Sequence, residues 1–270
     1  MSFHPQAILF RTFGVRPVRE MRNKIRLARG AWRMRRIENA EVARLGTTSP
    51  LAADVVTVVP TFRRPELLVT AVASALAQTY PDHAVIVIDD GGGLPALPQD
   101  PRLRVLSLAC NTRTPGVVRN VGIRLTESRL IAFLDDDNTW RPDHLATAVA
   151  EINRGADLVY TGVRLSNSDG SPYRVLSDPF DRVRHRADAF VDTNAIVVRR
   201  GRRVRYSRLP RTATTTPRED WEFVHRLSRR MTVRHVDRIT VDYLVHGDSY
   251  YTDWNADTSG PGPASAADSA

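Results

Sequence analysis

The segment 130–140 joins a short apolar run to three consecutive aspartates, Asp135, Asp136 and Asp137. An apolar run of about five residues between polar neighbours is typical of an inner strand in a parallel sheet whose two faces are covered by helices. Ligands bind such sheets at the carboxyl ends of the strands. Because adjacent carboxylates repel one another, the aspartates predict either a Mg²⁺ or Mn²⁺ site that carries a phosphate, or a solvated acidic turn.

Further short apolar runs alternate with helix-forming segments along the chain. Strands are expected at residues 54–59, 84–88, 103–108, 130–134, 156–160 and 192–198. Helices are expected after Pro65, after Asn111 and at residues 144–152. This alternation predicts an α/β domain with a mostly parallel central sheet flanked by helices, while the segment 162–186 is expected to be a polar loop.

The chain is expected to contain one large domain with appendages. Its 270 residues, 42% of them hydrophobic, suffice for one sizeable core. We expect this domain at residues 51–251, after a basic helical extension and linker at residues 1–50. Residues 252–270 are rich in Ser, Asp, Gly, Pro and Ala, a composition that predicts a disordered tail.

The extension carries most of the positive charge of the chain. The first 45 residues contain eleven Arg and Lys residues against three Glu residues, whereas the whole chain has a formal net charge of +9. Met21, Ile25, Ala28 and Trp32 recur at helical spacing in residues 17–45, which predicts a basic amphipathic helix. Packing on the domain and peripheral contact with an anionic membrane surface both stay open, and contact with nucleic acid is a third interpretation of such a helix. No nucleic-acid partner is expected, because few aromatic residues accompany the arginines.

The cysteine and lysine counts exclude several classes of site. Cys110 is the single cysteine, so no intramolecular disulfide is possible and a reducing, cytoplasmic setting is expected. Lys24 is the single lysine, so a Walker-type phosphate loop or a Schiff-base site beyond it is excluded. No apolar run approaches the ~18 to 20 residues of a membrane span, and no signal-peptide core is seen. A soluble protein, or one attached to the inner face of a membrane, is therefore expected.

Two further stretches place carboxylates where a ligand site is expected. Asp89 and Asp90 follow the second expected strand and precede three glycines, so they can accept hydrogen bonds from a nucleobase or ribose, or cap a turn. Asp220 lies in the first turn of a helix that Thr216 and Glu219 are predicted to open as a capping box. The helix dipole favours an ionised carboxylate there, as a general base requires.

Taken in order, these segments resemble those of the family 2 glycosyltransferases of the GT-A fold. The resemblance covers residues 54–249 and rests on six segments in the family order and at the family spacing. These segments are residues 58–62, 78–80, 87–91, 111–122, 135–142 and 219–221. The resemblance implies a Rossmann-like single domain of the GT-A type, with a nucleotide-sugar-binding half at residues 51–140 and an acceptor-binding half at residues 141–251.

The resemblance also implies roles for residues around the donor. Asp89 and Asp90 would contact the base or ribose of a nucleotide-sugar, as would Pro60 and Thr61 in the loop after the first strand. Arg119 matches a family arginine that lies near the donor. These five residues are therefore expected to surround the nucleotide.

The remaining implied roles concern the metal and the proton transfer. Asp135 and Asp137 match the family's pair of carboxylates separated by one residue, with Asp137 as the better candidate for the metal that bridges the donor phosphates. Asp136, between them, is counted with Asp135 among the donor-binding residues. Asp220 matches the catalytic base of the inverting members. His246 matches a C-terminal loop in which it would help to bind phosphate or metal, although an ordinary surface histidine is the other interpretation.

Two residues depart from the family pattern. Asn138 stands where members often have another Asp, and this change is expected to weaken metal binding. Arg63 stands where members often have Asn, and it is expected to add a positive charge near the donor phosphates. The expected reaction is metal-dependent, inverting transfer of a sugar from a nucleoside diphosphate, with uridine as the family's commonest nucleoside. A sugar, a natural product or a lipid-linked compound as acceptor, and a homodimer as the assembly, stay open.

Three other functions compete with this one. The segment 135–139 also fits the aspartyl-phosphate motif of haloacid-dehalogenase-like phosphatases, but their downstream lysine is missing. Nucleotidyltransferases of sugar phosphates usually begin with a glycine-rich loop and a lysine, which are missing too. A catalytically inactive nucleotide-sugar-binding domain, tethered by its basic helix to membrane or RNA, would be favoured if Asp137 or Asp220 lay far from the nucleotide pocket.

Overall fold

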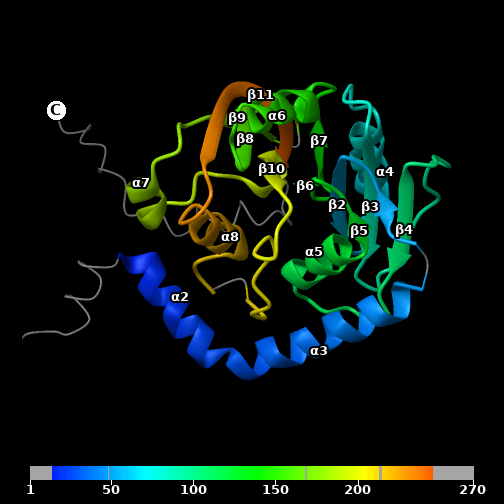
Figure 1. The fold of residues 1–270 in the computed structure, drawn as a ribbon, viewed down its shortest axis with the longest axis horizontal. Coiled ribbons are helices and arrows are strands. Elements are labelled where there is room, and N and C mark those ends of the chain that lie inside the picture. Colours follow the sequence, from blue (N-terminus) through cyan, green and yellow to red (C-terminus); the bar gives the residue numbers. More distant parts are fainter. Residues whose placement is uncertain (1–13, 48, 168, 213–214, 246–270) are drawn as a thin grey trace, which may run out of the picture.

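The computed structural model describes residues 14–47, 49–167, 169–212 and 215–245 of the chain. They fold around a nine-stranded sheet that is covered by helices. Two further helices, α2 (Val15–Arg26) and α3 (Ala28–Leu45), run along one side of the domain (Figure 1). The expected tail at residues 252–270 and His246 lie outside the described residues.

The first half of the sheet is parallel, as the alternation of strands and helices predicts. Its strands, in spatial order, are β4 (Leu103–Ser107), β3 (His83–Asp89), β2 (Val55–Thr61) and β6 (Leu130–Phe133). The connecting helices are α4 (Pro65–Leu76) and α5 (Pro115–Arg124). Every residue of β2, β3 and β6 is buried, because helices cover both faces of these continuous apolar runs. The carboxyl ends of the parallel strands therefore meet at one edge.

Helix α5 lies directly on this half of the sheet. A Cβ atom at Gly122 would lie only 2.6 Å from Cγ1 of Val58 on β2, so a larger residue would push the helix away. Arg119 is one turn earlier on the same helix. The close contact at Gly122 therefore also fixes the position of Arg119 relative to the strand ends.

The second half of the sheet is mixed, which corrects the expectation of a mostly parallel sheet. Its strands are β7 (Asn138–Trp140), β8 (Leu158–Asn167), β9 (Pro172–Leu176), β10 (Ile196–Arg199) and β11 (Val233–Val245), with helix α6 (His144–Asn153) packed against them. β8 and β11 pair in parallel. β10 is antiparallel to β6 and β8, β7 is antiparallel to β11, and β9 is antiparallel to β8.

The direction of β10 follows from the turn that precedes it. This 3₁₀ turn, η1 (Thr193–Ala195), lies beside the carboxyl end of β6, where Asn194 Oδ1 accepts a hydrogen bond from the backbone N–H of Asp135 at 2.6 Å. The chain leaves η1 directly into β10. Because β10 begins where β6 ends, it must run back along β6 rather than parallel to it.

The segment 162–186 is partly regular, although a polar loop was expected. β8 continues to Asn167 and pairs with β9, and the short helix α7 (Arg182–Ala187) follows. Four of the five residues of β9 are exposed. The sequence offers only the short alternation Tyr173-Arg174-Val175 here, which is too brief to predict a strand.

The basic extension forms two consecutive helices rather than one. Helices α2 and α3 meet at Leu27, and both pack on the domain. A short strand, β1 (Leu51–Ala52), then pairs with β5 (Thr126–Glu127) and leads the chain into the sheet. The apolar residues Met21, Ile25 and Trp32 do not mediate this packing, because all three are exposed. Within the described ranges, no helix combines the length and the apolar composition needed to cross a membrane.

Candidate active site

A cavity of about 610 Å³ lies at the carboxyl ends of β2 and β6. Its walls come from the loop after β2, the acidic segment after β6, and the first turns of α5 and α8 (Glu219–Leu227). The candidate residues that line it are Pro60, Thr61, Arg63, Asp90, Arg119, Asp135, Asp136, Asp137 and Asp220. The fold therefore brings together residues that are separated by up to 160 positions in the sequence.

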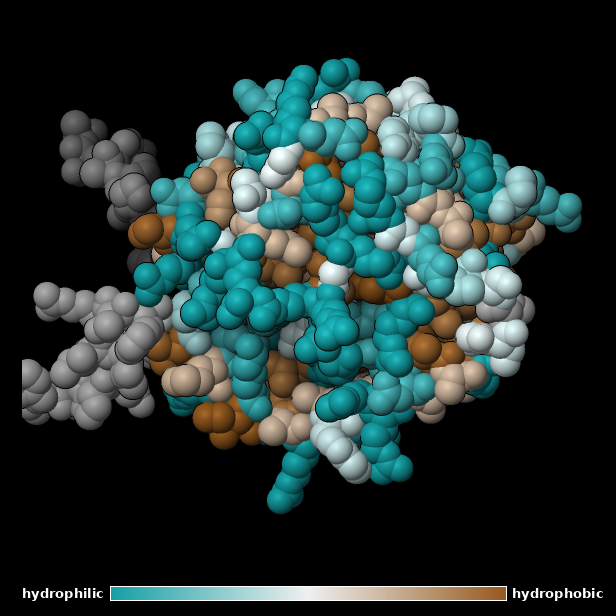
Figure 2. Space-filling model, viewed as in Figure 1, coloured by the Kyte–Doolittle hydropathy of each residue, from teal (hydrophilic) through white to brown (hydrophobic). Residues whose placement is uncertain are grey.

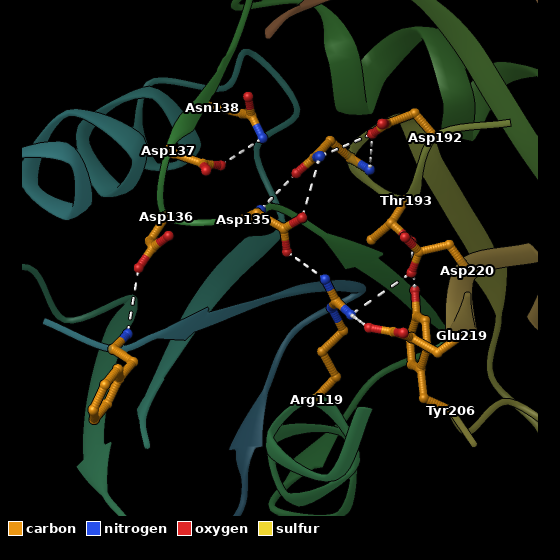
Figure 3. Close-up of polar contacts among 12 residues, drawn as sticks. Arg119, Asp135, Asp136, Asp137, Asn138, Asp192, Thr193, Tyr206, Glu219 and Asp220 are labelled. Atoms are coloured by element: carbon orange, nitrogen blue, oxygen red, sulfur yellow. Dashed lines mark hydrogen bonds and ion pairs between the residues drawn. The ribbon is translucent and has the colours of Figure 1, made fainter. Parts of the chain in front are cut away.

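The three aspartates after β6 point in different directions (Figure 3). Asp135 accepts a hydrogen bond from Nη2 of Arg119 at 2.5 Å. Asp136 is buried and accepts one from the hydroxyl of Thr61 at 2.7 Å. Burial raises the pKa of Asp136 to about 6, against the lowering effect of this hydrogen bond. Asp137 lies on the far side of the segment from Asp135, so the two family-motif carboxylates have separate surroundings.

Arg64 supplies the counter-charge for two of these aspartates. Its Nη1 atom lies 3.1 Å from Asp136 Oδ1 and 2.7 Å from Asp137 Oδ2. Arg63, which the sequence suggested instead, has its guanidinium 5.1 Å from the centre of the Phe62 ring and a left-handed backbone with φ of 55°. Two adjacent arginines carry no pattern that tells which one turns inward, so Arg64 was missed.

The carboxylates of the acidic segment are suitable ligands for a divalent cation, but their side chains do not converge on one position. Among the described residues, no group of three or more His, Cys, Asp or Glu side chains is placed to hold a metal ion. Mg²⁺ in phosphate sites usually takes only one or two carboxylates, and waters and substrate phosphates complete its shell. Asp135 and Asp137 can supply such ligands. An ion bound at Asp137 would have to compete with Arg64.

Arg119 connects the acidic segment to helix α8. Its side chain is only 5% exposed, and its Nη1 atom lies 3.7 Å from carboxylate oxygens of both Glu219 and Asp220. The guanidinium carbon is 4.9 Å from the centre of the Tyr206 ring, which supports it from below. Nε and Nη1 donate no hydrogen bond to any described residue. Arg119 is thus one buried cation shared by carboxylates from two elements, including Asp135.

Helix α8 begins differently from the sequence prediction. Its first residue is Glu219 and its N-cap is Arg218, with no side-chain cap, so the predicted capping box of Thr216 and Glu219 is wrong. The carboxylate of Glu219 turns to Arg119 instead. The positive charge that Glu219 faces is therefore the buried guanidinium, 3.7 Å away, rather than the N-terminus of the helix.

Asp220 has the surroundings of a general base. Burial, and then the charge of Glu219, raises the pKa of Asp220 to about 7, while Arg119 lowers it. Its Oδ1 atom accepts no hydrogen bond within the described residues, and its side chain is 39% exposed toward the cavity. A carboxyl group that titrates near neutral pH and is accessible to a ligand is suited to proton abstraction.

Asp89 and Asp90 are placed differently at the end of β3. Asp89 does not line the cavity, because its carboxylate accepts hydrogen bonds from the backbone N–H groups of Gly92 and Gly93 and caps a turn. Asp90 lines the cavity and accepts a hydrogen bond from the backbone N–H of Thr112 at 2.8 Å. Burial raises the pKa of Asp90. Of the two, only Asp90 is in a position to contact a ligand directly.

The turn before β10 adds two polar residues that were not expected in the site. Asp192 accepts hydrogen bonds from the backbone and the side chain of Asn194, both at 2.8 Å, and burial raises the pKa of Asp192 to about 6. Both residues line the cavity with Thr193 between them. The sequence signal that could have indicated these site residues is the polar triplet 192–194, which precedes the apolar residues 195–198.

The single cysteine lies next to the cavity wall. Cys110 is exposed and directly precedes Asn111, which lines the cavity. Gly91, with φ of 77°, lies against this loop, and a Cβ atom there would be 3.0 Å from the backbone carbonyl carbon of Cys110. The loop is therefore held tightly at the end of β3.

Comparison with known sequences agrees with this arrangement. The family model described as "Glycosyl transferase family 2" matches residues 56–211, which is more than half of the chain. The succinoglycan biosynthesis protein ExoO of Rhizobium meliloti (strain 1021) is 37% identical over 131 residues, which are 46% of this chain and 37% of that protein. Succinoglycan biosynthesis protein ExoW of the same strain is 36% identical over 111 residues, which are 38% of this chain and 35% of that protein. The chain thus spans little more than a third of the length of these two relatives.

Comparison with solved structures addresses the fold. The crystal structure of residues 1–349 of S. aureus TarS in complex with UDP-GlcNAc superposes with a TM-score of 0.56 and 16% identity, covering 74% of this chain and 60% of that one. The UDP complex of the same protein gives a TM-score of 0.55 and 17% identity, with 74% and 63% covered. This likeness confirms the expected GT-A fold class. Because the family model also covers the nucleotide-side motifs and more than half of the residues, the chain belongs to glycosyl transferase family 2.

Proposed function

We propose that the chain is a glycosyltransferase that moves a sugar from a UDP-sugar to an acceptor hydroxyl, with inversion at the anomeric carbon and with Mn²⁺ or Mg²⁺ bound. The observation that carries the proposal is that Asp220, Arg119 and the acidic segment line one cavity. An inactive, tethered domain would be favoured if Asp137 or Asp220 were remote from the pocket, and both line it. Loss of turnover with retained UDP binding in Asp220→Asn is the decisive test.

The comparisons support the choice of substrates. TarS was crystallised with UDP-GlcNAc, which supports a UDP-sugar as the donor. ExoO and ExoW are named for succinoglycan biosynthesis, which supports a saccharide as the acceptor, either as a growing chain or on a lipid carrier. A cytoplasmic location stays a prediction.

The proposed reaction is a single displacement. Asp220 accepts the proton of the acceptor hydroxyl, the acceptor oxygen forms a bond to the anomeric carbon, and the bond between that carbon and the donor phosphate breaks. Attack from the face opposite the leaving group inverts the anomeric centre. A divalent metal, when bound, would neutralise the charge that develops on the leaving phosphates. Asp137 would hold it.

Arg119 and Glu219 act on Asp220 in opposite directions. The Arg119 charge favours the ionised carboxylate, and the Glu219 charge disfavours it. Arg119 also forms an ion pair with Asp135. It therefore fixes the position of Asp220 relative to the acidic segment. The pKa of the base is therefore set by a balance between two neighbours that are themselves part of the cavity wall.

Asp137→Ala is expected to remove the metal dependence of UDP binding. The wild type should bind UDP in the presence of Mn²⁺ and lose most of this affinity on addition of a chelator. The variant should lose at least ~10-fold in the presence of Mn²⁺, since even outer-shell partners of a metal are worth that much. Calorimetric titration of UDP measures both. Asp169→Ala, in the exposed turn between β8 and β9, is the control, and an equal metal dependence in Asp137→Ala would rule out its role as a ligand.

Arg64→Gln is expected to strengthen Mn²⁺ binding. Arg64 lies 2.7 Å from Asp137 and is 29% exposed, so removing it frees the carboxylate from an ion pair worth ~1 kcal/mol, or about fivefold in the dissociation constant. Titration of Mn²⁺ without nucleotide measures the change. Arg63→Gln is the matched control, because it removes the same charge one residue away, where the guanidinium lies near Phe62 instead. Weaker Mn²⁺ binding in Arg64→Gln would contradict the expected competition.

A further inference from the structure

Helices α2 and α3 have an inner face that carries all of their acidic residues. Within residues 14–47 the glutamates are Glu20, Glu38 and Glu41, which are 4%, 0% and 6% exposed. Glu20 pairs with Arg211 at 2.9 Å, and Glu38 pairs with Arg208 at 2.6 Å. The acidic side chains are therefore used to fasten the helices to the domain.

The outer face of the two helices is cationic as a result. Nine basic residues between positions 14 and 47 are exposed, Arg22, Arg26, Arg29, Arg33 and Arg36 among them. No acidic side chain is exposed in the same range. Charges on a protein surface are usually of mixed sign, so a helix pair that presents only one sign to the solvent favours a partner of the opposite charge.

Large apolar side chains lie among these cations. Met21, Ile25 and Trp32 are 54%, 73% and 61% exposed. The guanidinium of Arg36 lies 4.9 Å from the centre of the Trp32 ring. Hydrophobic surface lies beside hydrophilic side chains along the edge of the molecule where α2 runs (Figure 2). Exposing these apolar side chains to water is unfavourable. A cationic helix face that carries Trp and aliphatic residues is typical of helices that bind at the surface of an anionic bilayer.

A second cavity opens beside the same face. It has a volume of about 950 Å³ and lies between α3, the segment 203–209 and α8. Five of its arginines make no ion pair with any described residue: Arg35, Arg203, Arg205, Arg229 and Arg230. Trp32 lines this cavity and also belongs to the exposed apolar group. Trp32 thus joins the basic cavity to the exposed apolar side chains of α2 and α3.

We propose that the outer face of α2 and α3 docks on an anionic lipid bilayer, with Met21, Ile25 and Trp32 entering the interfacial region and the arginine-lined cavity receiving lipid phosphates. Guanidinium groups bind phosphate oxygens with paired hydrogen bonds, and Trp prefers the headgroup level of a bilayer. A nucleic acid would satisfy the arginines and leave Met21 and Ile25 in water. A second copy of the chain would bring two cationic faces together, which is unfavourable.

The test is co-sedimentation of the full chain with vesicles. Binding is expected to vesicles of phosphatidylcholine mixed with an equal amount of phosphatidylglycerol, and not to phosphatidylcholine alone. Binding should fall steeply at ~1 M salt, where the Debye length is only about 3 Å. The double variant Ile25→Ser, Trp32→Ser is expected to bind at least ~10-fold more weakly, because each large apolar side chain contributes on that order when buried. Val183→Ser is the matched control, since Val183 is 75% exposed on α7.

A second pair of variants tests the cavity. Arg229→Gln with Arg230→Gln should weaken binding to the anionic vesicles about 25-fold, since each basic residue near such a surface contributes about fivefold. Arg164→Gln with Arg202→Gln removes the same charge from exposed positions elsewhere and should have a smaller effect. Inorganic pyrophosphate should compete for the cavity but not abolish binding by the apolar side chains, which distinguishes a free phosphate ligand from a lipid surface.

Three results would overturn the proposal. These are equal binding to neutral and anionic vesicles, unchanged binding by the Ile25 and Trp32 variant, and tight binding to RNA without binding to vesicles. Unchanged circular dichroism confirms that each variant is folded. UDP binding is expected to stay at the wild-type level in all of these variants. None of the substituted residues lines the donor cavity, the cavity at the carboxyl ends of β2 and β6. A failure of the membrane proposal therefore leaves the proposed transfer reaction untouched, and the reverse also holds.

Discussion

Asp220→Asn is expected to lower kcat by ~10² to 10⁴-fold while the affinity for UDP stays close to that of the wild type. Asparagine keeps the size of the side chain and cannot accept the proton of the acceptor. Steady-state transfer assays and UDP calorimetry measure the two quantities separately. The variant should be at least as stable as the wild type at neutral pH, because a carboxyl group whose folded pKa is raised costs stability once it ionises.

Glu219→Gln is the matched control for this experiment. Glu219 is the neighbouring carboxylate in the same helical turn, and both lie 3.7 Å from Arg119. It is expected to retain activity within about tenfold, since it serves no proton transfer. If Glu219→Gln were inactive and Asp220→Asn active, the two roles would have to be exchanged. Near wild-type turnover in Asp220→Asn would refute the assignment of the base.

The pH profile gives an independent measure of the same group. A base must be ionised to act, so kcat/KM should rise with pH through about 7, the value to which burial and Glu219 raise the pKa of Asp220. Glu219→Gln removes a charge that raises this pKa, so it should move the acidic limb of the profile to lower pH. A limb that stays in place in this variant would mean that another group controls it.

Glu38→Ala is expected to lower the free energy of unfolding by ~3 to 5 kcal/mol. Glu38 is fully buried and accepts hydrogen bonds from Arg208, Arg124 and the buried Asn120, so its removal takes a hydrogen-bond acceptor from each of these three side chains. Chemical denaturation measures the change. The free energy should fall mainly because Arg208, whose side chain is only 21% exposed, loses its counter-charge.

Two further variants make this expectation specific. Glu66→Ala, at an exposed position in the first turn of α4, should change stability by no more than ~0.5 kcal/mol. Glu38→Leu combined with Arg208→Met removes both partners and should recover much of the loss, because well-packed apolar residues often replace a buried ion pair without cost. Wild-type stability in Glu38→Ala would show that α3 does not depend on this contact with the domain.

The parts of the fold that could be predicted are those in which one residue pattern has one stable solution. The strands β2, β3 and β6 are continuous apolar runs, and such runs are stable only inside a covered sheet. Their parallel order places Thr61, Asp90 and the acidic segment at one edge, so most candidate residues came together. The mixed half of the sheet was not predictable, because the direction of β10 depends on where η1 docks rather than on the residues of the strand.

The incorrect predictions share a cause. The partner of a polar side chain depends on which residues the fold brings near it, and the local sequence does not show this. Glu219 has the spacing of a capping residue, yet a buried arginine from another helix attracts it. The amphipathic pattern of α2 and α3 marks an apolar stripe, yet ion pairs rather than this stripe hold the helices on the domain. Arg64 could not be separated from Arg63, because only the local backbone decides which of the two meets the aspartates.

The position of Cys110 makes the chain suitable for fluorescence. It is the single thiol in 270 residues, it is exposed, and its neighbour Asn111 lines the donor cavity. An environment-sensitive dye attached there would label one site only, without any substitution of other cysteines. Because the loop is held against Gly91, the dye would be tethered to a rigid part of the cavity wall and would report the arrival of a nucleotide as a change in emission.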